Sequence, residues 1–191
     1  YWAQRQFDPH DVSFIPRGFA ISHVNLTHRN WTAIGLPELS IYPIVDPRGL
    51  ITPIQDGWSI DFWLLDSNGK ALVPSRLKED AAAQTLLMNG TLAVETTCRA
   101  GSLRLQQTAA VELQDGEPVV GIDVCASSPG GGGALVVAIR PYNPEGVQFI
   151  DHITALPGHE GFRVNDRVEV RMNRSADALL SSDYDHGDVF S

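Results

Sequence analysis

Residues 91–126 read TLAVETTCRAGSLRLQQTAAVELQDGEPVVGIDVCA, and this stretch decides the fold. Apolar and polar side chains alternate on both sides of Ala100–Gly101, which is the period of a half-buried β-strand. A second turn signal, Asp115–Gly116, separates this alternation from the β-branched, apolar run at 118–126. The stretch therefore predicts three consecutive antiparallel strands and not a β–α–β unit.

The strand pattern continues in both directions from this stretch. Asn89–Gly90, the strongest short hairpin signal, precedes it, and a glycine-rich loop at 127–133 leads from it into a continuous apolar strand at 134–139. One short helix is predicted at 77–83. Further strands are predicted at 19–24, 39–45, 50–53, 59–65, 70–73, 147–153, 161–164 and 168–172.

Turn signals separate all of these runs, which is typical of an all-β protein. We expect a large antiparallel sandwich of two stacked sheets, with roughly ten to fourteen strands and at most one or two short helices. With 191 residues, the chain is long enough to bury a core without disulfides or a metal. We divide it into an N-terminal arm at 1–14, the sandwich at 15–178 and a tail or linker at 179–191.

The net charge limits the classes of partner. The chain carries a formal charge of −9 and has no long run of Lys or Arg, so we expect neither nucleic acid nor anionic lipid as a partner. No apolar run approaches the roughly 20 residues that a membrane helix needs. The first residues lack the pattern of a signal peptide, and we expect a cytoplasmic protein, although a signal cleaved upstream of Tyr1 would leave no trace in this sequence.

The two cysteines, Cys98 and Cys125, lie in two different predicted strands. Two cysteines are too few for a disulfide framework, so we expect two small buried residues. The alternative is one bridge between adjacent strands, which implies an oxidising compartment.

Motifs of known catalytic chemistry are missing from the sequence. GxSxG, HExxH, CxxC and the P-loop do not occur, and the glycine run at 130–133 leads into a strand instead of the helix N-terminus that cradles a phosphate. Paired carboxylates support glycoside hydrolysis, but carboxylates at turns are common for local hydrogen-bonding reasons. The sequence brings no two of these candidates together: Asp56, Asp61, Glu145 and Asp151.

The tail contains a cluster of residue types that bind metals. Their spacing matches no established metal-binding loop, so we expect a solvated tail or linker, with no metal and no cofactor. The cluster consists of Asp183, Asp185, His186 and Asp188.

Polar and aromatic side chains gather in two places that the strand pattern does not explain. One is Arg29, Asn30 and Trp31, which are consecutive. The other is Arg140, Tyr142 and Asn143, where Pro141 cannot donate to a strand ladder and the sheet must end or reach an edge. Other aromatic candidates for stacking on a sugar ring are Tyr42, Trp58 and Trp63, of which Trp63 lies within a strand and is expected in the core.

Four segments in combination resemble a known family: RGFAISHVNLTHRNWTAIGLP at 17–37, DPRGLITP at 46–53, IRPYNPEGVQFI at 139–150 and SSDYDHGDV at 181–189. They are similar to the N-terminal β-sandwich domain of bacterial glycogen-debranching-enzyme-like proteins, the amylo-α-1,6-glucosidase group of six-hairpin glycosidases. The resemblance runs over most of residues 15–190. It implies a supersandwich like that of galactose mutarotase, in agreement with the strand pattern.

In that family the sandwich precedes a helical toroid that carries the general acid and base. The resemblance therefore implies a non-catalytic module of a glycoside hydrolase acting on α-glucans. Its implied partner is a helical catalytic domain of the same polypeptide, and its implied ligand is an α-glucan or oligosaccharide. No catalytic residue is carried over to this chain, so enzyme activity of this chain alone is doubtful.

Two interpretations of the polar and aromatic residues remain open. In the first, they form an edge that docks on the helical domain or borders its sugar cleft. In the second, they lock a strand corner within the sandwich by satisfying backbone groups. The alternatives to the module are a free-standing carbohydrate-binding sandwich with exposed tryptophans and a mutarotase-type epimerase. The candidate site consists of Arg29, Asn30, Trp31, Arg140, Tyr142 and Asn143.

Overall fold

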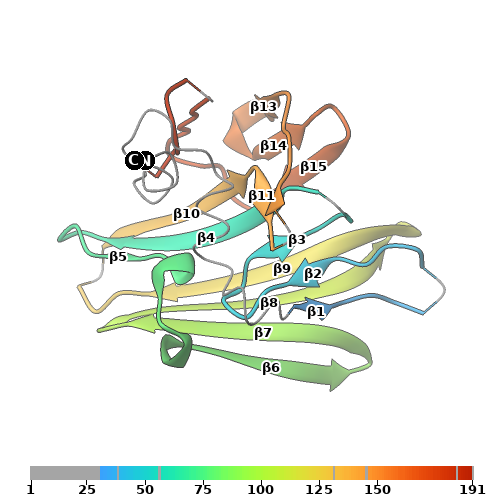
Figure 1. The fold of residues 1–191 in the computed structure, drawn as a ribbon, viewed down its shortest axis with the longest axis horizontal. Coiled ribbons are helices and arrows are strands. Elements are labelled where there is room, and N and C mark those ends of the chain that lie inside the picture. The colour runs from blue at the N-terminus through green and yellow to red at the C-terminus, as the bar shows by residue number, and fades with distance from the viewer. Residues whose placement is uncertain are drawn as a thin grey trace, which may run out of the picture.

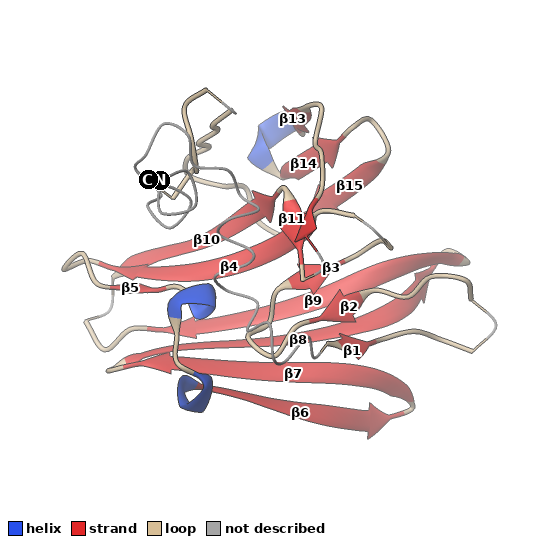
Figure 2. Ribbon diagram, in the orientation of Figure 1, coloured by secondary structure: helices blue, strands red, loops and turns tan. Residues whose placement is uncertain are grey.

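The structure of the chain is a computed structural model that describes residues 31–37, 39–55, 57–130, 132–144, 146–183 and 185–190. The strand predicted at 19–24, together with Arg29 and Asn30, lies outside these residues. Strands dominate the described part (Figure 2), and its helices are single 3₁₀ turns at Pro74–Arg76, Glu79–Ala81 and Pro157–His159. The predicted all-β class is confirmed.

The first sheet has four antiparallel strands in chain order: β6 (Ala82–Asn89), β7 (Thr91–Ala100), β8 (Leu103–Gln114) and β9 (Glu117–Ser127). Their registers are continuous, so each strand pairs with the next over most of its length. The meander predicted from the alternating stretch is confirmed, with small shifts at the strand ends.

The helix predicted at 77–83 is wrong. A 3₁₀ turn at Glu79–Ala81 leads directly into β6, which begins at Ala82 and pairs with β7 from its first residue. Cross-strand pairing here outweighs the helix preference of a few alanines, as tertiary context commonly does with weak local propensity.

The second sheet has six strands and is built around one long pair. β4 (Ser59–Asp66) and β10 (Gly133–Arg140) pair antiparallel along their whole length. The sheet order is β1–β2–β3–β4–β10, and β5 also pairs with β4. The remaining four strands have two residues each: β1 (Thr32–Ala33), β2 (Ile44–Val45), β3 (Ile51–Thr52) and β5 (Ala71–Leu72).

The two sheets face each other and enclose the main core, as the layered ribbons of Figure 1 show. Because side chains alternate along a strand, Ile60, Phe62 and Leu64 of β4 point toward the four-stranded sheet. They pack with the inner residues of that sheet, which include Val94, Cys98, Leu103, Leu105, Ala109 and Val111.

A polar turn packs against the inner face of the four-stranded sheet. The DPRG turn at 46–49 is held by side chains of the four-stranded sheet: Gln84 Nε2 donates to the Asp46 carbonyl at 2.9 Å, and Gln107 Nε2 donates to the Gly49 carbonyl. Within the turn, the Asp46 carboxylate accepts from the backbone N–H of Arg48 and Leu50, both at 2.8 Å. The polar residues on the inner face of this sheet therefore satisfy the turn's backbone groups.

A small three-stranded sheet covers one end of the sandwich. It comprises β13 (Ile153–Ala155), β14 (Gly161–Val164) and β15 (Val168–Arg171), and a separate hairpin pairs β11 (Tyr142–Asn143) with β12 (Gly146–Val147). The strand predicted at 147–153 is wrong, because the chain is irregular between β12 and β13. There the Asn165 side chain accepts from the N–H of Asp151 and His152 in place of a ladder.

Candidate functional site

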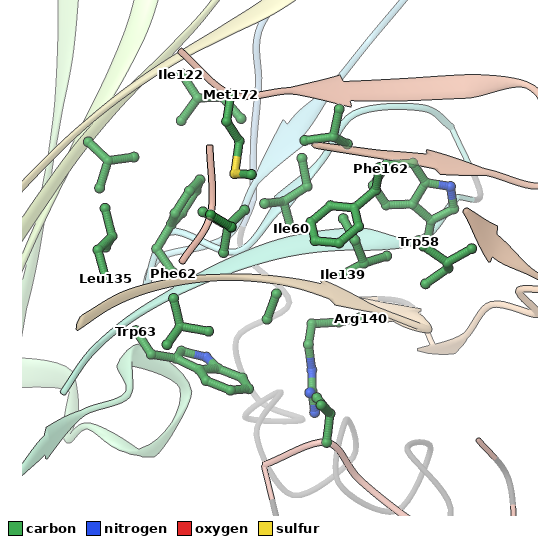
Figure 3. A pocket seen from close by; sticks show the side chains of 18 of the residues that line it. Trp58, Ile60, Phe62, Trp63, Ile122, Leu135, Ile139, Arg140, Phe162 and Met172 are labelled. Atoms are coloured by element: carbon green, nitrogen blue, oxygen red, sulfur yellow. The ribbon is translucent and has the colours of Figure 1, made fainter. Parts of the chain in front are cut away.

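The outer face of the β4–β10 pair carries a buried polar cluster. Asp61 and Trp63 point away from the core because they alternate with Ile60 and Phe62. Arg140 shares their face, since it lies opposite Ser59 in the register and Ala138 lies opposite Asp61. Figure 3 shows Trp63 and Arg140 on one side of the β4–β10 pair and Phe62 and Ile139 on the other.

Arg140 is the centre of this cluster and is almost completely buried. Its guanidinium forms an ion pair with Asp188, and its Nε donates to the Tyr142 hydroxyl at 3.1 Å. The guanidinium carbon also lies 5.3 Å from the ring centroid of Trp63 and 5.2 Å from that of Tyr142. Arginine suits this position because it offers several fixed donors and a flat surface for aromatic rings.

Asp61 lies close enough to Arg140 to be affected by its charge. Its Oδ2 accepts from Trp63 Nε1 at 2.7 Å, and its Oδ1 accepts from the Phe62 N–H at 2.9 Å. Burial raises the pKa of Asp61 to about 6, even though the Trp63 hydrogen bond and the Arg140 charge both lower it. Asp61 is therefore charged at neutral pH, and burying this charge lowers the stability of the fold.

Residues 188–190 close the cluster from outside. Asp188 binds Arg140, and its Oδ1 accepts from the Phe190 N–H at 2.8 Å. The Phe190 ring meets Trp63 edge-on, with 5.2 Å between the ring centroids, and the Arg76 guanidinium carbon lies 3.8 Å from the Phe190 ring centroid. This end of the predicted tail thus packs on the sheet, whereas Asp183 and His186 are exposed and pair with each other at 2.5 Å.

The structure brings together half of the predicted site residues. Arg140 and Tyr142 are hydrogen-bonded, and Asn143 Nδ2 donates to the Gly57 carbonyl at 3.0 Å. All three side chains are covered by the protein itself, which supports the internal lock for them and leaves no surface for docking there. Trp31 is 38% exposed and precedes β1, at the opposite edge of the six-stranded sheet from β10.

The other sequence candidates are scattered. Trp58 and Trp63 are buried, and Tyr42 is exposed. Asp151 is exposed and distant in the chain from the buried Asp61, while Asp56 and Glu145 lie outside the described residues. No two described members of the predicted carboxylate set are therefore placed as a solvent-accessible pair.

The cysteines do not form a bridge. Cys98 is buried and Cys125 is exposed, and both are free thiols. β8 separates their strands, and the register places Cys98 opposite Leu105 while Cys125 lies opposite Gln106, so the two thiols point to opposite faces of the sheet. The expectation of two buried cysteines is correct for Cys98 and wrong for Cys125.

A second feature, missed by the sequence analysis, is an apolar cleft at the open side of the sandwich. It lies between β9 and β10, the edge strands of the two sheets, and the small sheet borders it. Figure 3 shows five of the side chains around this space, namely Ile122, Leu135, Ile139, Phe162 and Met172. The sequence feature that could have indicated the cleft is the uninterrupted apolar run at 134–139, which suits a strand covered on both faces.

The inner faces of both edge strands are only partly covered. Their half-buried residues are Val120, Ile122, Val124 and Ala126 of β9, and Val137 and Ile139 of β10. At the rim, Phe149 is 89% exposed and Leu180 is 83% exposed. Apolar surface gathered in this way is characteristic of an interaction site.

Neither feature has the composition of a metal centre. Within the described ranges, no three His, Cys, Asp or Glu side chains are grouped so that they could hold a metal ion. The same part of the chain contains no helix that is long and apolar enough to cross a membrane.

Comparison of the chain with models of protein families, with curated proteins and with solved structures found no match.

Replacing Asp61 by Asn is expected to remove a pH-dependent loss of stability. The pKa of Asp61 rises from an ordinary value of 3.8 to about 6 on folding, so its contribution is most favourable below pH 3.8 and is lost as the pH rises through 6. A shift of this size corresponds to about 3 kcal/mol. The difference in unfolding free energy, Asp61→Asn minus the unsubstituted chain, should therefore increase by about that amount between pH 4 and pH 7.

Urea unfolding across this pH range measures the difference. Asp66→Asn is the control, because Asp66 is partly exposed and its pKa is lowered by backbone hydrogen bonds, first that from Lys70. The difference in unfolding free energy, Asp66→Asn minus the unsubstituted chain, should decrease as the pH rises. A difference for Asp61→Asn that is flat with pH would show that the carboxyl group is not held in its buried, charged form.

Proposed function

We propose that this chain is a non-catalytic β-sandwich module that docks a helical catalytic domain of the same polypeptide, in a glycoside hydrolase acting on α-glucans. The cleft between β9 and β10 carries the docking part of the proposal. It leaves the inner faces of both edge strands partly uncovered along their length. An apolar surface that runs along two strands suits a folded element better than a single sugar.

The α-glucan part of the proposal rests on the resemblance of the four segments. Two of these segments meet in the structure, since Arg140 and Tyr142 come from one and Asp188 from another. A third, DPRGLITP, contains the turn that Gln84 and Gln107 of the four-stranded sheet hold by hydrogen bonds. These segments form contacts within the sandwich, so the proposal assigns docking to the cleft and not to these segments.

The free-standing carbohydrate-binding module receives less support. Sugar platforms need exposed aromatic faces, and of the described tryptophans Trp58 and Trp63 are buried while Trp31 is partly exposed. A mutarotase-type site needs a histidine and a carboxylate on a sheet face. Within the described residues, the two His–Asp pairs, His152–Asp166 and Asp183–His186, lie outside the strands.

The proposal is tested by reading the frame downstream of Ser191 and by reconstitution. If the frame continues into a region of paired amphipathic helices, that region is produced separately and mixed with this chain. We expect a complex that releases glucose from an α-1,6-linked glucan. Phe149→Asp should weaken the complex by at least about tenfold, because aromatic anchors dominate interfaces.

Leu113→Asp provides the matched control, since Leu113 is 56% exposed and does not line the cleft. It should change the affinity by less than about twofold. A frame that stops soon after Ser191, or equal effects of the two substitutions, would contradict the proposal. Quenching of tryptophan fluorescence by a linear α-glucan, with loss of the signal in Trp31→Ala, would favour the carbohydrate-binding alternative.

A further inference from the structure

We propose that the cleft receives its partner by strand addition: an extended, cationic segment with alternating aliphatic side chains pairs with the open edge of β10. The proposal deepens the proposed function, on which it rests for the presence of a partner in the cleft. It adds the mode of recognition and the chemistry of the segment that is recognised.

The edge of β10 is available for pairing within the described structure. β10 pairs with β4 on one side, and no described residue forms a ladder with its other side. Gly133, Ala134 and Leu135 are exposed, and Leu135 points into the cleft (Figure 3). A strand with an unpaired row of N–H and C=O groups is a template for another strand.

The sequence of β10 lacks the features that block such pairing. Edge strands are commonly protected by proline, charge or a bulge. The neighbouring edge, β9, carries Glu117, Pro118 and Asp123. In contrast, β10 reads GALVVAIR, and its one charged residue, Arg140, is buried in the ion pair on the outer face. β10 thus has the composition of a central strand at the position of an edge strand.

The added strand would complete the core as well as the sheet. Alternate residues of β10 point into the cleft, where Leu135, Val137 and Ile139 face the half-covered inner side of β9. A strand next to β10 would place its own alternate side chains over the same space. Aliphatic residues at every second position therefore match the cleft, as in other complexes formed by strand addition.

The charge of the chain favours a cationic segment. The chain carries a formal charge of −9, which attracts a cationic partner and disfavours a second copy of this chain as the occupant.

The test uses the full chain and a fluorescein-labelled peptide as long as the 8 residues of β10, with valine and lysine alternating. Fluorescence anisotropy measures the affinity, and hydrogen exchange measures protection of the amides at 134–139. We expect binding together with at least about tenfold slower exchange at alternate amides of β10. A peptide of the same sequence, N-methylated along one edge, should lose both effects because it cannot form the ladder.

Leu135→Gln should weaken binding of the valine–lysine peptide by about tenfold, because it removes apolar contact without adding charge. Leu113→Gln is the matched control at an exposed leucine outside the cleft, and should leave binding within about twofold. Circular dichroism of both variants checks the fold. A valine–glutamate peptide should bind more weakly than the valine–lysine peptide.

Three results would overturn the inference. One is equal binding of the N-methylated peptide, and another is equal binding of the valine–glutamate peptide. The third is a dimer of this chain, seen by sedimentation, that Leu135→Gln dissociates, since this would assign the edge to a second copy. Binding of the helical region without protection of the amides at 134–139 would reject strand addition while leaving the proposed docking function in place.

Discussion

Arg140→Met is expected to lower the free energy of unfolding by about 3–5 kcal/mol, because it leaves the carboxylate of Asp188 buried without its cation. The loss includes the hydrogen bond to the Tyr142 hydroxyl and the contacts with two aromatic rings. Methionine fills much of the same space, so the result reports mainly on the charge. Equilibrium unfolding in urea at neutral pH measures the effect.

Two further variants identify the cause. Arg163→Met breaks a pair with Glu169 in which the Arg163 side chain is 46% exposed, and should lower stability far less than Arg140→Met, because solvent screens an exposed pair. Adding Asp188→Leu to Arg140→Met should restore part of the lost stability, because no unpaired charge remains. Equal losses for Arg140→Met and Arg163→Met would show that the guanidinium of Arg140 is not buried against Asp188.

The tie between Arg140 and Asp188 could not be predicted from the sequence. The two residues are 48 positions apart, and nothing in the local pattern around either one identifies the other. The sequence did indicate that Arg140, Tyr142 and Asn143 are unusual for a strand end. It left open whether they meet a partner or the chain itself, because that depends on where the last residues of the chain run.

The long strands were predictable because their patterns are local. β7 and β8 alternate in polarity, β9 is a β-branched apolar run, and turn residues separate the three strands, so their registers follow from the hairpins. The strands of two residues, such as β2 and β3, have too little sequence to show a period. Ile44–Val45 and Ile51–Thr52 are strands because β4 and the held turn at 46–49 place them beside each other.

The cleft was the part of the candidate site that sequence reasoning missed. The sequence predicts a continuous apolar strand at 134–139, and such a run is typical of a strand buried on both faces. The structure makes β10 the last strand of its sheet among the described residues, with Val137 and Ile139 half-buried. The mismatch between a central-strand sequence and an edge position appears only when the sheet order is known.

Trp63→Ala is expected to lower the free energy of unfolding by about 3–5 kcal/mol, the range for removing a large buried aromatic side chain. The ring contacts Phe190 edge-on at 5.2 Å, and its Nε1 donates to Asp61 at 2.7 Å. The substitution therefore also removes a donor that favours the charged form of Asp61. The pKa of Asp61, already raised to about 6 by burial, should move further upward.

This second effect separates the hydrogen bond from the packing. Trp63→Phe keeps most of the apolar contact but has no N–H, so it should lose less stability and still extend the pH-dependent loss to higher pH. Trp31→Ala serves as the control: Trp31 is 38% exposed, and its loss should be below about 1 kcal/mol with no change in pH dependence. If Trp63→Phe left the pH dependence unchanged, the Trp63 N–H would not be what holds the buried Asp61 carboxylate in its charged form.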